Sequence, residues 1–248
     1  FFLWRREQVP GRLPPERMHR AIVSGARYAF HSPPIRIVLI RAFVFGVTSA
    51  SVAALTPLVA RDLLHGDAKT YGLLLGAGGV GAVLGALLIG PVRERLKGEH
   101  AVRLSVGTAG LMVLLVGLSH DLLLTGAVML LAGAANMLLI SLLNVAVQLS
   151  APRWVTARAL SLFNASLTGG IALGAWLWGQ AAGEWGVGAA LIASGALLVL
   201  TLLIGFVLPM PAVSFAEVEM VDIGHEPEVA LAITARSGPI VIEIDYRV

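Results

Sequence analysis

The chain has 248 residues, a formal net charge of +3 and no cysteine; 57% of its residues are hydrophobic and only 13% are charged. Soluble domains carry about a quarter charged residues, so this composition excludes an ordinary soluble globular protein and indicates membrane spans. The lack of cysteine excludes a disulfide framework and a cysteine-ligated metal. The basic residues cluster beside apolar segments, so the positive charge does not predict nucleic-acid binding.

Residues 1–35 are predicted to be a cytoplasmic linker that follows an N-terminal half of the protein. The aromatic and apolar residues 1–4 are followed by Arg5 and Arg6, a pattern typical of a helix that leaves the membrane on its cytoplasmic side. We therefore expect the chain to be a fragment. Residues 16–31 can form a short amphipathic helix on the membrane surface, and a solvated linker helix fits the same pattern.

Six apolar segments predict transmembrane helices, over residues 36–60, 72–91, 101–119, 122–149, 157–182 and 187–208. Each is near the roughly 20 residues that a bilayer requires. Their continuous apolarity excludes the strands of a membrane barrel, which alternate apolar and polar residues. The links are short, so successive spans run antiparallel. The sequence predicts an all-α membrane protein with a six-transmembrane-helix bundle over residues 36–210.

Lysine and arginine are distributed unevenly around these spans. The segment before the first span, the second and fourth connections and the adjoining span ends (Arg36, Arg103 and Arg158) carry thirteen of them, whereas the other three connections carry only Arg61 and Lys69. Positive residues favour the cytoplasmic side, so both ends of the chain are predicted to be cytoplasmic. Arg41 lies about one turn inside that boundary, and we expect its long side chain to reach the interface.

Residues 211–248 differ in character from the spans. They are mixed and acidic up to about residue 238, and residues 239–248 then alternate apolar and charged side chains. Such alternation is typical of a half-buried strand. The sequence predicts a cytoplasmic tail that begins a truncated α+β domain.

Polar side chains within the apolar spans are candidates for a substrate cavity, since they are costly in hydrocarbon unless they face protein or water. The predicted cavity set comes from the first, fourth and fifth spans and comprises Thr48, Ser51, Asn136, Ser141, Asn144 and Asn164. Interhelical hydrogen bonds of the amides are an alternative, as are hydroxyl bonds of Thr and Ser to their own helix. Gln148, near the cytoplasmic end, is assigned to packing.

Small residues dominate the second and fifth spans. Gly81 and Gly85 are four residues apart and therefore share one helix face, as do Gly170 and Gly174. Helices in lipid associate through close backbone approach at such residues. The spacing predicts helix packing, either static or as faces that slide against a partner bundle.

Neither a catalytic constellation nor a nucleotide-binding motif is found in the sequence. The six histidines are scattered through polar segments, without metal-ligand spacing. We expect no enzymatic activity, no cofactor and no metal.

Three stretches resemble the C-terminal half of a major facilitator superfamily transporter. GPVRERLKGEH, residues 90–100, resembles the cytoplasmic Gly-x-x-x-Asp-Arg-x-x-Arg loop of that superfamily, with Glu94 nearest to the acidic position. Residues 25–43 and 152–179 are similar to the enterobactin-exporter-like (transmembrane secretion effector) subfamily of bacterial exporters. Ala157 stands where those relatives have a glycine. The resemblance covers residues 1–210.

The resemblance implies that the six spans are helices seven to twelve of a twelve-helix fold. Helices seven and ten would line the central cavity, and nine and twelve would face lipid. The residues of the implied cytoplasmic gate loop are Gly90, Arg93, Arg95 and Lys97. The expected partners are the lipid bilayer, a missing N-terminal six-helix half and a small-molecule substrate, with no nucleic acid.

The sequence thus predicts a secondary active transporter of the bacterial cytoplasmic (inner) membrane. It would export a siderophore, a drug or a secondary metabolite by alternating access, as a proton-coupled antiporter. No Asp or Glu lies in the core of any span, so the titrating group is expected in the missing half. Two alternatives stay open: a membrane anchor or sensor that presents a C-terminal ferredoxin-like domain, and a monooxygenase-like activity in that domain.

Overall fold

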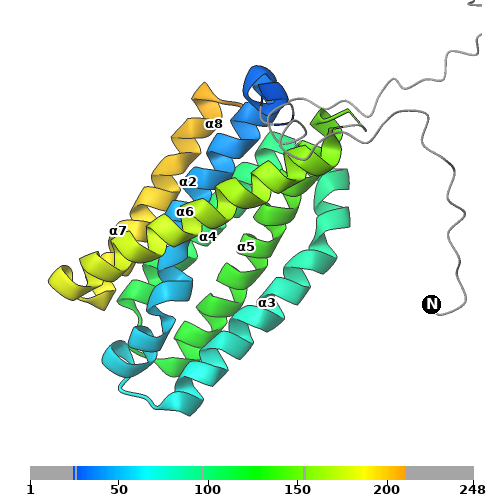
Figure 1. Ribbon diagram of the computed structural model, residues 1–248. Coiled ribbons are helices and arrows are strands. Elements are labelled where there is room, and N and C mark those ends of the chain that lie inside the picture. The colour runs from blue at the N-terminus through cyan, green and yellow to red at the C-terminus, as the bar shows by residue number, and fades with distance from the viewer. Residues whose placement is uncertain (1–24, 26, 97, 153–154, 211–248) are drawn as a thin grey trace, which may run out of the picture. The chain divides into compact units, whose positions relative to one another are not determined.

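The computed structural model describes residues 25, 27–96, 98–152 and 155–210 (Figure 1). Of the described residues 91% are helical, and none of them forms a strand. Residues 27–31, at the end of the predicted linker helix, are helical. The rest of that helix lies mostly outside the described residues, and the predicted tail over residues 211–248 lies wholly outside them.

Six helical segments are long and apolar enough to cross a membrane. The elements are α2 (Pro33–Leu58) with its π-helical extension η1 (Val59–Leu63), α3 (Ala68–Arg95), α4 (Gly98–Leu118), α5 (Leu122–Ser150), α6 (Thr156–Trp185), and α7 (Val187–Leu200) with its extensions η2 (Thr201–Leu203) and α8 (Ile204–Val207). The prediction of an all-α bundle with six spans is confirmed. Most helices extend beyond the predicted spans, because their polar end turns stay helical without adding to hydropathy.

Short polar residues explain where two of the helices begin. The Asp67 carboxylate accepts hydrogen bonds from the backbone N–H groups of Lys69 (3.0 Å) and Thr70 (3.1 Å) at the start of α3. Asp121 accepts from the backbone N–H of Leu124 (2.8 Å) at the start of α5. These carboxylates satisfy N–H groups that have no partner within the helix.

Successive helices run in opposite directions, so the connections gather at two ends of the bundle (Figure 1). We call one of them the basic end: α2 begins there, α3 and α5 end there, and it carries Arg36, Arg93, Arg95 and Arg158. The opposite end holds the turns after η1, α4 and α6. This grouping agrees with the charge asymmetry of the sequence.

Glycines lie where paired helices approach each other most closely. A side-chain carbon added at Gly81 or Gly85 of α3 would overlap the backbone of α5 at Leu130 or Ala134. On α6, Gly170 and Gly174 stand in the same relation to the backbone of α2. The four predicted packing glycines therefore lie where the backbones of two helices touch. Larger residues at these positions would force the helices apart.

The two parallel pairs, α2 with α6 and α5 with α3, use the same contact register. The α2–α6 contacts are Phe43–Gly170, Gly46–Leu167 and Val47–Gly174, and the α5–α3 contacts are Leu130–Gly81, Gly133–Gly78 and Ala134–Gly85. The spacings are identical on both sides, so α2 corresponds to α5 and α3 to α6. Because α2 and α5 cross the bundle in opposite directions, the six helices form an inverted repeat of two three-helix units.

The third and sixth spans bury one side and expose leucine on the other. On α4 the exposed residues recur at helical spacing, at Leu104, Leu111, Leu115 and Leu118. The segment from α7 to α8 likewise exposes Leu197, Leu200, Leu203 and Phe206. Their buried sides contact each other through Gly110 and Gly195 and through Gly117 and Gly188. The exposed apolar stripes suit contact with lipid.

Candidate functional site

A cavity of about 430 Å³ lies between α2, α3 and α5, toward the bundle end opposite the basic end. Buried residues of α4 and α7 close it from behind, at Ala109, Val113 and Leu198. Its other walls are formed by Ser49, Val52, Ala53 and Thr56 of α2, by Leu74, Leu75, Gly78, Gly79 and Ala82 of α3, and by Met129, Ala132, Gly133, Asn136 and Met137 of α5. This size is within the usual range of small-molecule sites.

The walls of the cavity are apolar apart from three side chains, Ser49, Thr56 and Asn136. The hydroxyl of Thr56 donates to the backbone oxygen of Val52 in its own helix. The half-buried Asn136 amide makes no hydrogen bond to any residue that the structure describes. An amide offers both donors and an acceptor, so Asn136 can bond a ligand in either direction.

Asn136 and Ser49 occupy equivalent positions in the inverted repeat. Asn136 follows Ala134 by two residues in α5, and Ser49 follows Val47 by two residues in α2. Both line the same cavity. The repeat therefore places two polar groups near the midpoints of α2 and α5.

Ser49 was not in the predicted set, and the two predicted cavity residues of α2, Thr48 and Ser51, are not among the lining residues described for this cavity. The buried Thr48 hydroxyl donates to the backbone oxygens of Val44 (2.9 Å) and Phe45 (3.2 Å) in the same helix. Ser51 is fully buried and accepts a hydrogen bond from the hydroxyl of Ser194 on α7 (2.7 Å). Thr48 thus satisfies itself within α2, and Ser51 joins α2 to α7.

Three further predicted residues lie closer to the basic end. The Asn144 oxygen accepts from the Gln148 amide at 2.6 Å, one turn along α5. Ser141 is half-buried, and Asn164 is exposed on α6. None of the three is among the lining residues described for the cavity. Their assignment to a substrate cavity stays a prediction.

The predicted gate loop is mostly helical. Gly90, Arg93 and Arg95 are exposed on the last turns of α3, and Lys97 lies outside the described residues. Helix α3 ends at Arg95 and α4 begins at Gly98, which leaves a connection too short to form an independent loop. Its role as a gate stays a prediction.

A partly buried charge cluster at the basic end was not foreseen from the sequence. The Glu99 carboxylate, in the first turn of α4, accepts from Arg41 Nη1 of α2 (2.7 Å) and from Arg103 Nε (2.8 Å). It also accepts from the backbone N–H of Met210, after α8 (2.8 Å). Glu99 therefore ties together α2, α4 and the end of the sixth span. We call Arg41, Glu99 and Arg103 the Glu99 cluster.

The Arg41 side chain turns toward the basic end but is buried there, and its expected reach to the membrane interface stays a prediction. Its side chain is only 8% exposed, because it turns toward Glu99 and toward the backbone oxygen of Leu208 (3.3 Å). The i,i+4 spacing of Glu99 and Arg103 was a visible signal for their pair. The contact with Arg41 joins residues 58 positions apart, which no local pattern shows.

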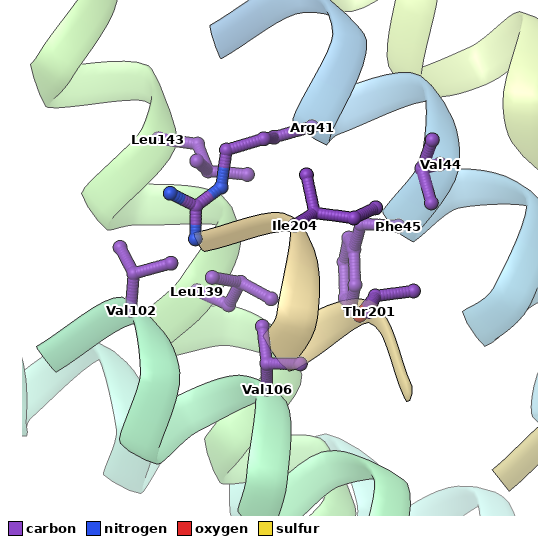
Figure 2. Close-up of a pocket in the computed structure, with 9 residues that line it drawn as sticks. All are labelled: Arg41, Val44, Phe45, Val102, Val106, Leu139, Leu143, Thr201 and Ile204. Atoms are coloured by element: carbon purple, nitrogen blue, oxygen red, sulfur yellow. The ribbon is translucent and has the colours of Figure 1, made fainter. Parts of the chain in front are cut away.

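The bundle interior beside Arg41 is tightly filled. Figure 2 shows side chains of α2, α4, α5, η2 and α8 that converge on a pocket with only about 20 Å³ of free space. Phe45, Leu139 and Leu143 are among the large apolar side chains that line it. Of these two cavities, the larger lies toward the end opposite the basic end.

These features together define a multi-pass α-helical membrane protein with an internal inverted repeat and a cavity of about 430 Å³. No group of three His, Asp or Glu side chains that could hold a metal ion occurs among the described residues. A family model described as transmembrane secretion effector matches residues 1–248. The chain therefore belongs to the transmembrane secretion effector family of the major facilitator superfamily and is a membrane transport protein. The comparisons with curated proteins and with solved structures found no match.

Proposed function

We propose that this bundle is the C-terminal half of a secondary active transporter that exports a small molecule by alternating access. The observation that carries the proposal is the 430 Å³ cavity with the unpartnered amide of Asn136, near the midpoint of a membrane span. A polar group at that depth is costly unless it faces water or a ligand. A simple membrane anchor requires neither the cavity nor the amide, and membership of a transporter family argues against an enzyme.

A second six-helix half is the proposed partner of this bundle. Helices α3 and α6 are the least covered by the rest of the bundle, since only 17% and 22% of the residues in their most apolar 18-residue stretches are buried. For α2 and α4 the buried shares are 50% and 56%. Their uncovered faces would pack against the other half, while the leucine stripes of α4 and of the α7–α8 segment would meet lipid.

The basic end is proposed to face the cytoplasm of a bacterium, in the inner membrane. The charge asymmetry supports this orientation because Lys and Arg favour the cytoplasmic side. Arg93 and Arg95 would then belong to a cytoplasmic gate, and the cavity would lie toward the outer side. In this arrangement the substrate leaves through the end at which the cavity lies.

Coupling to protons is proposed to require a carboxylate of the other half. Glu99 lies in the first turn of α4 at the basic end, and two arginines and a backbone N–H already engage it. A carboxylate held in this way is suited to structure rather than to proton exchange. Proton antiport would therefore require a titratable carboxylate in the helices of the proposed other half.

Transport by the full-length protein in vesicles with an imposed proton gradient tests the proposal. We expect added organic compounds to dissipate the gradient in vesicles with the protein and not in empty vesicles. Asn136→Leu should abolish or alter that response, and Asn144→Leu tests the second predicted amide. Gln148→Leu is the matched control for Asn136→Leu alone, because it removes an exposed amide of the same helix that does not line the cavity but does donate to Asn144. An unchanged substrate profile in Asn136→Leu would remove the site assignment, and no transport of any compound would remove the function.

A further inference from the structure

We propose that the cavity binds an uncharged, mainly apolar portion of the transported molecule, held by one hydrogen-bonding group paired with Asn136. This inference rests on the proposed function and deepens it, since it names the chemical class of the substrate. It excludes ligands whose charge would have to enter the cavity.

The first argument is the absence of charge from the cavity walls. No described residue that lines the cavity is ionisable. The buried cation Arg41 lies in the Glu99 cluster at the other end of the bundle and is paired there. An ion placed in the cavity would lose its hydration without gaining a counter-charge from this bundle, which opposes binding. An apolar ligand loses no such hydration.

The second argument is the chemistry of the side chains that are present. Met129 and Met137 flank Asn136 on α5, and both line the cavity. Methionine is flexible and polarizable, so it adapts to apolar groups of different shapes. One amide among such side chains fixes the orientation of a ligand that carries a carbonyl, amide, hydroxyl or secondary amine. The combination favours a hydrophobe with one such group at Asn136, and the Ser49 hydroxyl is a second polar group in the same cavity wall.

The third argument is the shape of the cavity, which fits a small molecule and no helix. A helix with its side chains is about 10–12 Å across. The cavity holds about 430 Å³ and reaches inward to Leu198 and Val113, which are buried inside the bundle. A helix of the other half could cover its mouth but could not fill it. The occupant is therefore a molecule of drug size or smaller.

A pair of related probes separates charge from shape. N-phenyl-1-naphthylamine is neutral and carries one N–H donor. Its analogue 8-anilino-1-naphthalenesulfonate has the same ring skeleton and an added sulfonate. Because this chain contains no cysteine, an Ala53→Cys variant in a cysteine-free full-length protein gives a single maleimide target in the cavity wall. Leu123→Cys provides an exposed target outside the cavity, since Leu123 is 83% exposed.

We expect the neutral probe to slow maleimide labelling of Ala53→Cys in a saturable manner and to leave Leu123→Cys unaffected. The sulfonate should need at least about a tenfold higher concentration for the same protection. Asn136→Leu in the Ala53→Cys background should weaken protection by the neutral probe about fivefold, the effect of one hydrogen bond. Gln148→Leu in that background should not change it.

The inference is overturned if both probes protect equally, if Asn136→Leu leaves protection unchanged, or if the neutral probe gives no protection. Each of these results is compatible with transport of some other compound in the vesicle assay, so the proposed function would stand. Conversely, protection without any transport would leave a binding site and remove the transporter. The two experiments therefore fail independently.

Discussion

Gly85→Ala tests the packing of α3 on α5 with a control on the same helix. The added methyl group would lie within 2.9 Å of the Ala134 Cα and closer still to its carbonyl oxygen. These are backbone atoms and cannot rotate away, so the helices must separate. At Gly76, two turns earlier on α3, an added methyl group meets nothing within 4 Å.

The two substitutions share their effect on helix propensity and differ only in contact. Replacing glycine by alanine in a helix stabilises it by up to about 1 kcal/mol. Overpacking a close contact costs about 1–3 kcal/mol. We therefore expect Gly76→Ala to be neutral or to stabilise the chain by up to ~1 kcal/mol, whereas Gly85→Ala lowers the free energy of unfolding by about 1–2 kcal/mol.

The assay is unfolding of the 248-residue chain in detergent micelles by titrated SDS, followed by circular dichroism. The inverted repeat adds a second comparison on α6. Gly174 contacts the backbone of α2 at Val47, while Gly179 has nothing within 4 Å. Gly174→Ala should match Gly85→Ala, and Gly179→Ala should match Gly76→Ala. If the contact and control variants unfold alike, the close approach of these helices is refuted.

Two further outcomes are expected from charged groups. Glu99→Ala should lower the free energy of unfolding by about 3 kcal/mol in the same assay, because it leaves the buried Arg41 cation without its carboxylate. Adding Arg41→Met to Glu99→Ala should restore part of that loss. If the costs of the two substitutions are strictly additive, the pairing of Arg41 with Glu99 is contradicted. The backbone N–H of Thr70, followed by that of Lys69, lowers the pKa of the Asp67 carboxyl below its ordinary value of 3.8. The ionised Asp67 carboxylate therefore stabilises the folded chain at pH values above 3.8. This stabilisation is lost as the pH falls through the lowered pKa that Asp67 has in the folded state. Asp67→Asn should therefore flatten the acid limb of a pH titration of the unfolding midpoint below about pH 4, and an identical limb in both proteins would refute the cap.

The sequence alone predicted the parts of this fold that depend on local composition. Hydropathy located all six spans. The four-residue spacing of glycines marked the face of α3 that meets α5 at Gly81 and the face of α6 that meets α2 at Gly170. The site was predictable only in part. Asn136 stands out as an amide in an apolar helix, but nothing local distinguishes it from Asn144, which bonds its own helix neighbour. Which polar group faces a cavity depends on helix rotation within the bundle, and that is set by contacts between distant residues.

The two halves of the inverted repeat differ in side-chain volume where α2 lines the 430 Å³ cavity and α5 lines the small pocket near the basic end. The α2 wall of the cavity includes Val52 and Thr56, whose equivalents in α5 by the shared register are Leu139 and Leu143. With Phe45, these leucines leave only about 20 Å³ free toward the basic end. The backbone is repeated, but side-chain volume is not, so one crevice stays open and its counterpart is filled.

This asymmetry constrains how the basic end could open during transport. Rotation of single side chains cannot clear the filled crevice, because large apolar residues from two helices occupy it together. The Glu99 cluster also joins α2 and α4 to the chain after α8 at that end. Under the proposed function, access from the basic end would require displacement of whole helices or of the entire bundle, as the rocking of rigid halves provides. A flexible gate confined to the short connection between α3 and α4 would not suffice.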